Sequence, residues 1–160
     1  MPNDKSLREH LAALLKGGHA HVTFETALKG LPAALRGKRP KGAEHSPWEL
    51  LEHIRIAQSD ILEFSRDANH VSPAWPAGYW PKTQAPPNDK AWAKSVRSAG
   101  ADLAAMCTLV ADESTDLHAR IPHGDGQTIL REALLIADHT AYHLGELVLV
   151  RRLLGAWHSS

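Results

Sequence analysis

Three histidines have a type and spacing that could bind a metal ion. His139 and His143 lie four residues apart in one apolar segment, and His53 lies in another. An α-helix turns once every 3.6 residues, so side chains at positions i and i+4 project from one face at successive turns. Two such imidazoles can bind one ion if a neighbouring helix supplies the third ligand. Three protein nitrogens leave at least one coordination position open, as in catalytic metal sites.

The spacing of these histidines is weak evidence when it is taken alone. The chain has 11 histidines in 160 residues, and roughly one His-x3-His pair is expected by chance from such a composition. Buried neutral imidazoles need hydrogen-bond partners or a metal, so a metal site and a structural histidine pair are both open. Thr140 stands where His-Glu-x-x-His metalloproteases have their glutamate, which argues against a peptidase of that type.

Two further sets of residues are candidates around the histidines. Glu146 lies seven residues after His139, nearly on the same helical face. It could orient an imidazole, act as an acid or base, or be a fourth ligand, and a solvated or interface carboxylate is the alternative. Trp75, Tyr79 and Trp80 belong to a proline-rich aromatic segment. We expect these three aromatic residues to wall the site and contact the substrate.

The segments that must position these residues have helical periodicity, so the predicted fold is all-α. We expect a single domain over residues 1–160. The expected helices lie at about 4–16 and 19–29 (one helix in two pieces), 46–66, 88–111 and 127–154. The clearest boundary is at Ser46, because Ser46 and Glu49 have capping-box spacing and Pro47 suits the first helical position.

The proline-rich loop at 67–87 is far longer than the usual connection in a helical bundle. A crossover explains its length, because the chain then returns along the bundle before the third helix begins. The expected fold is therefore an up-down-down-up four-helix bundle whose second and fourth helices are antiparallel. His53 would lie about 10 Å from the start of its helix and His143 about 16 Å from the end of its own. Because the two helices are antiparallel, both distances are measured from the same end of the bundle. The histidines would therefore lie at similar heights, and one ion could bridge the two helices.

Composition narrows the function classes. The chain is 43% apolar and 22% charged, which is typical of a soluble globular protein. Lysine plus arginine (18) equals aspartate plus glutamate (18), and no basic run occurs, so nucleic-acid binding is not expected. We expect no membrane span, no signal peptide and a cytoplasmic location. The helix at 127–154 is apolar on more than one side, which predicts a homodimer.

Two segments, 46–54 (SPWELLEHI) and 138–147 (DHTAYHLGEL), resemble the motifs of the DinB-like (damage-inducible-like) family of metal-binding helical bundles. The resemblance covers most of the chain. It implies an up-down-down-up bundle, often dimeric, in which one histidine of helix 2 and two of helix 4 bind a divalent metal. In this sequence those positions are His53, His139 and His143.

The activities found in that family include metal-dependent thiol transfer, and we expect transfer of a low-molecular-weight thiol to a small electrophilic substrate. Zinc and nickel are the first candidates for the metal, although imidazole suits copper and iron as well. A metal-dependent hydrolase is one alternative. A non-catalytic dimeric bundle with a structural or adventitious metal is the other, and an open coordination position would separate it from an enzyme.

Overall fold

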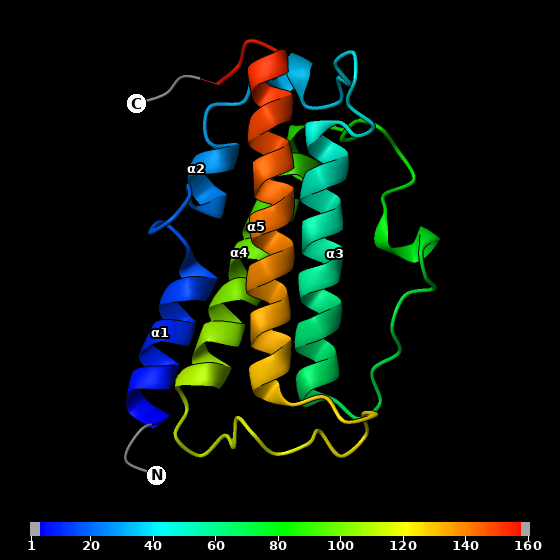
Figure 1. Cartoon of the computed structure of the whole chain (residues 1–160). Helices are drawn as coiled ribbons and strands as arrows, with labels where there is room; N and C mark the ends of the chain where they lie inside the picture. The colour runs from blue at the N-terminus through cyan, green and yellow to red at the C-terminus, as the bar shows by residue number, and fades with distance from the viewer. Residues whose placement is uncertain (1–3, 158–160) are drawn as a thin grey trace.

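The computed structural model describes residues 4–157 and shows four main helices that pack as a bundle (Figure 1). The helices are α1 (Asp4–Lys16), a short α2 (Phe24–Leu28), α3 (Pro47–Arg66), α4 (Asp89–Ala111) and α5 (Ile129–Leu153), with 3-10 turns at Ala33–Leu35 and Ala77–Tyr79. Over residues 4–157, β-type pairing is confined to one isolated bridge between Arg120 and Thr128. The predicted all-α class with four main helices is confirmed.

The direction of the helices can be followed in Figure 1. There α1 and α5 run in one direction, and α3 and α4 run in the other. The crossover segment, residues 67–88, leaves the end of α3 and returns along the side of the bundle to the start of α4. Both α4 and α5 pack against α3. The two helices that carry the three histidines are therefore antiparallel neighbours.

Side-chain caps fix the starts of the three long helices. The Ser46 hydroxyl accepts from the backbone N–H of Glu49 at 3.2 Å, and the Glu49 carboxylate accepts from the Ser46 N–H at 2.8 Å, so the predicted capping box is present. Asn88 and Thr128 cap α4 and α5 through the side chain alone, which accepts from a backbone N–H in the first turn of each helix. A cap residue has non-helical backbone angles. The helices therefore begin one or two residues later than the predicted ranges.

The predicted second piece of the first helix, residues 19–29, is wrong in extent. Helical structure is confined there to α2, Phe24–Leu28. Gly17 and Gly18 both adopt left-handed backbone angles, with φ of 70° and 88°, and this conformation ends α1. Thr23 then starts α2 with a side-chain cap. The residues between the glycines and Thr23 form a connection instead of the first turns of a helix.

Packing between α3 and α5 sets the level of the histidines. Leu51 and Ile54 of α3 and Leu144 of α5 are at most 2% exposed and belong to one core cluster. Burial of each such side chain contributes about 1.5–3 kcal/mol. In the same interface the Gln58 side chain donates a buried hydrogen bond to the Thr140 hydroxyl at 3.1 Å. These contacts fix the register in which α3 faces α5.

The outer face of α5 is apolar as well. Leu134, Tyr142, Leu149 and Leu153 are between 45% and 73% exposed, although the opposite side of the helix lies in the core. In the described part of the chain, neither α5 nor any other helix is long and apolar enough to cross a membrane. The exposed apolar side chains of α5 lie on the outer surface of the bundle.

Candidate metal centre

His53, His139 and His143 meet where α3 faces α5. His53 lies two turns into α3, and His139 and His143 lie one turn apart on α5. His53 is 6% exposed and His143 is 8% exposed, whereas His139 is half-buried. We call this group of three side chains the candidate metal centre. The predicted cluster is present in the fold.

One distance within the candidate metal centre matches that between two ligands of a shared ion. Nε2 of His53 lies 3.0 Å from Nε2 of His139, and one ligand nitrogen from each ring lies within 4.8 Å of the other two. Two nitrogens that bind one ion at about 2.1 Å lie about 3.0–3.4 Å apart at common coordination angles. The separation of His53 and His139 therefore matches that of two ligands of one ion.

Hydrogen bonds from Nδ1 orient two of the three rings. Nδ1 of His53 donates to the backbone carbonyl oxygen of Tyr79 at 2.8 Å. Nδ1 of His143 lies 3.0 Å from a carboxylate oxygen of Glu146. A neutral imidazole that donates from Nδ1 carries its lone pair on Nε2. Metal-ligating histidines almost always use their second nitrogen in this way, for a carboxylate or a backbone carbonyl.

Burial keeps these imidazoles neutral. Burial, with a smaller contribution from the neighbouring histidines, lowers the pKa of His139 and of His143 to about 4. Burial also lowers the pKa of His53, although the hydrogen bond to Tyr79 acts in the opposite direction. All three rings are therefore mostly neutral near pH 7, and each then has one nitrogen without a proton. Only an unprotonated imidazole nitrogen can bind a metal ion.

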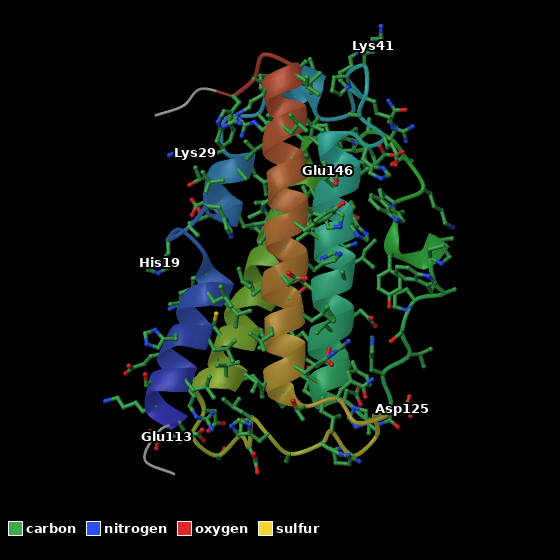
Figure 2. All side chains as sticks on the ribbon, in the orientation of Figure 1. His19, Lys29, Lys41, Glu113, Asp125 and Glu146 are labelled. Atoms are coloured by element: carbon green, nitrogen blue, oxygen red, sulfur yellow. The ribbon has the colours of Figure 1, made fainter. Side chains whose placement is uncertain are left out.

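Glu146 lies on α5 close to the candidate metal centre. Figure 2 labels it in the upper half of the bundle, where α5 lies beside α3. Burial raises the pKa of Glu146, whereas His45 and His53 act to lower it. A carboxylate that binds Nδ1 of a ligand histidine orients the ring and increases its basicity. The contact with His143 is of this kind, and a catalytic role for Glu146 stays a prediction.

The aromatic residues of the crossover segment take different positions relative to the histidines. Trp80 stacks on His53 with ring centroids 3.9 Å apart and planes within 2° of parallel, and it also stacks on His45 at 4.0 Å. Tyr79 contacts His53 through its backbone carbonyl, and its hydroxyl donates a hydrogen bond to Asp60, which lies further along α3. Trp75 is 81% exposed and packs edge-on against Tyr79. The predicted contact of these residues with a substrate stays a prediction.

Three residues near the centre were not singled out by the sequence patterns. His45 stacks on Trp80, Tyr142 packs edge-on against His143 at 4.9 Å, and Asp60 binds the Tyr79 hydroxyl. The sequence could have indicated Asp60, because it lies seven residues after His53 and so projects from nearly the same face of the helix. It could not have indicated the Tyr79 carbonyl, since every residue carries a backbone carbonyl.

Comparison with known families agrees with this geometry. The DinB superfamily matches residues 19–147, a span that contains His53, His139 and His143. No curated protein and no solved structure matches the chain. The family match covers most of the sequence, and the clustered histidines lie within it. The chain belongs to the DinB superfamily.

Proposed function

We propose that this protein is a divalent-metal-dependent enzyme that transfers a low-molecular-weight thiol to a small electrophilic substrate at His53, His139 and His143. The observation that carries the metal-binding part is the pair of Nδ1 hydrogen bonds, from His53 to Tyr79 and from His143 to Glu146. These bonds leave Nε2 unprotonated and hold each ring in one orientation, as in metal-ligating histidines. Zinc and nickel are the first candidates for the ion, because imidazole suits both.

Three protein ligands leave a coordination position for the substrate. A divalent ion supplies Lewis acidity, which lowers the pKa of a thiol at that position. The chain's own groups hold the ligand rings, and Trp80 covers one face of His53 and excludes water from it. In the transfer, the thiol sulfur forms a bond to the electrophilic carbon as the bond from that carbon to its leaving group breaks. The leaving group keeps the electron pair, and the thiol proton passes to solvent.

The thiol must arrive as a substrate, because the chain's one cysteine lies elsewhere. Cys107 is on α4 and lines a groove with Lys16 and Phe24. Burial raises the pKa of the Cys107 thiol, so at neutral pH it is mostly protonated and a poor nucleophile. Hydrolysis would need a general base, and Glu146, the candidate, already binds His143. We therefore place thiol transfer ahead of metal-dependent hydrolysis.

The test combines metal analysis with a conjugation assay on protein purified without a histidine tag. Wild-type protein is expected to bind a divalent ion and to conjugate at least one of several low-molecular-weight thiols to a model electrophile. His143→Ala is expected to lose the ion and at least about 100-fold in conjugation rate. His118→Ala is the matched control, because His118 is exposed beside Asp4. Unchanged conjugation in His143→Ala would contradict the proposed role.

The alternative, a non-catalytic bundle with a structural or adventitious ion, predicts a different coordination sphere. The visible spectrum of the cobalt-substituted protein distinguishes the two, because it reports ligand number and type. A spectrum that changes when a thiol is added supports the enzyme. A spectrum of four protein ligands that is insensitive to thiols supports the structural alternative.

We also propose that the protein is a homodimer that associates through the outer face of α5. Leu134, Tyr142, Leu149 and Leu153 are exposed there, and their spacing places them on one side of the helix. An isologous contact between two such faces would cover all of them. Sedimentation at tens of micromolar is expected to give the mass of two chains, and Leu149→Lys to shift the protein to a monomer. A monomeric wild type at that concentration contradicts the proposal.

A further inference from the structure

Asp60 is a buried carboxylate of α3 that is not one of the proposed metal ligands. We infer that Asp60 is a positioning residue for the candidate metal centre: through Tyr79 it holds a backbone carbonyl against His53 and so fixes which nitrogen of His53 faces the other histidines. The consequence for metal affinity rests on the proposed function.

Both oxygens of Asp60 bind the crossover segment. Oδ1 lies 2.7 Å from Nε2 of His70, and Oδ2 accepts a hydrogen bond from the Tyr79 hydroxyl at 2.6 Å. Asp60 is 9% exposed, and a carboxylate this buried needs a partner for each oxygen. It projects from nearly the same face of α3 as His53, two turns further along the helix. Asp60 thus contacts the crossover segment at two points, and of these two residues Tyr79 is the one that also contacts His53.

Tyr79 connects Asp60 to the candidate metal centre. Its hydroxyl is held by Asp60, and its carbonyl oxygen accepts from Nδ1 of His53 at 2.8 Å. Burial and the Asp60 carboxylate raise the pKa of Tyr79 to about 12, so the hydroxyl stays a donor throughout the neutral range. Trp80, the next residue, stacks on the same His53 ring. By holding the Tyr79 side chain, Asp60 therefore places both Tyr79 and Trp80 against the ring of His53.

The contact with Tyr79 decides the tautomer of His53. Because Nδ1 donates to the carbonyl, the lone pair is on Nε2, the atom that lies 3.0 Å from Nε2 of His139. If the carbonyl moves away, either nitrogen can carry the proton. Some molecules then present an N–H where an ion would bind. Asp60 thus influences metal affinity without touching the ion, as outer partners of ligand histidines do.

Two variants test the inference. Tyr79→Phe removes only the hydroxyl and keeps the ring and the carbonyl, so it guards against a failure of Asp60→Ala to fold. The readout is nitrogen NMR of the His53 ring in metal-free protein, which distinguishes protonation at Nδ1 from protonation at Nε2. Wild type is expected to hold the proton on Nδ1, and both variants to show a mixture. His70→Ala is the matched control, because it removes the other partner of Asp60 and leaves the link to Tyr79 intact.

Zinc titration gives a second, separate measurement. Affinity is expected to fall about 10–100-fold in Tyr79→Phe and in Asp60→Ala, and the double variant to fall no further than Asp60→Ala. His70→Ala is expected to keep wild-type affinity. An unchanged His53 tautomer in both variants overturns the inference, whatever the protein binds. A wild type that binds neither zinc nor nickel overturns the proposed function instead, and the tautomers then still decide the inference.

Discussion

Metal binding by this protein is expected to be nearly independent of pH over a range in which ordinary histidine sites weaken. Protons compete with the ion for the Nε2 lone pairs, so affinity falls once the ligand imidazoles are protonated. Burial lowers the pKa of His139 and of His143 to about 4. At about pH 6, an imidazole with an ordinary pKa of about 6.5 is roughly three-quarters protonated, and one with a pKa of about 4 is about 1% protonated.

The difference is large enough to measure. Two ordinary histidine ligands would lose about 14-fold in affinity between about pH 7.5 and pH 6. His139 and His143, each with a pKa of about 4, should lose less than about 1.5-fold over the same interval. The lowered pKa of His53 acts in the same direction. Steep loss, as protons displace the ion, is expected only below about pH 5.

The assay is a competition titration of zinc against a chelator of known pH dependence, carried out on metal-stripped protein at several pH values. Proton NMR of the histidine rings in the metal-free protein measures the same pKa values directly. His118→Ala should reproduce the wild-type profile, because His118 is exposed beside Asp4 and outside the centre. A fall of tenfold or more between about pH 7.5 and pH 6 would refute the argument that burial keeps the ligand rings neutral.

Three further predictions concern stability. The metal-free protein should lose stability as the pH falls from about 6.5 towards 4. In that window the unfolded chain takes up more protons, because the folded-state pKa of His139 and His143 lies below the unfolded-state value. Urea unfolding at a series of pH values measures the loss, and above about pH 7.5 these two groups should not make the free energy of unfolding depend on pH. His139→Leu should abolish metal binding and leave the metal-free protein at least as stable as wild type at neutral pH, as thermal unfolding can show. Leu51→Ala, at a fully buried position, should lower the free energy of unfolding by about 2–5 kcal/mol, whereas Leu14→Ala, at a residue 52% exposed, should change it by about 0.5 kcal/mol or less in the same denaturation experiment.

The helix boundaries show which parts of a fold can be predicted from local chemistry. Ser46 and Glu49 placed the start of α3 within one residue, because a capping box acts between residues three positions apart. The prediction of a helix over residues 19–29 was wrong in extent because the apolar spacing of this segment continues a helical pattern. A glycine pair permits a break but does not show where the next helix resumes, and here Gly17 and Gly18 both adopt left-handed angles.

The candidate site likewise has contacts that the sequence could predict and contacts that it could not. The adjacency of His139 and His143 follows from helical geometry, and His53 joins them through the packing of α3 on α5. The family motifs supported this combination where spacing alone did not. The Tyr79 carbonyl and the stacking of His45 on Trp80 depend on the path of the crossover segment. Helical periodicity does not determine the path of a loop, so these contacts required the structure.

Packing alone does not explain why three imidazoles lie between α3 and α5. Neighbouring positions of the same interface hold apolar side chains such as Leu51 and Leu144, which contribute about 1.5–3 kcal/mol each by burial. At the histidines the interior instead holds polar rings, two of them oriented by a carboxylate and a backbone carbonyl. Departures from the packing pattern that gather at one point are expected at functional sites. The cluster is therefore better explained by the proposed metal binding than by packing, and the stability of His139→Leu measures that trade-off directly.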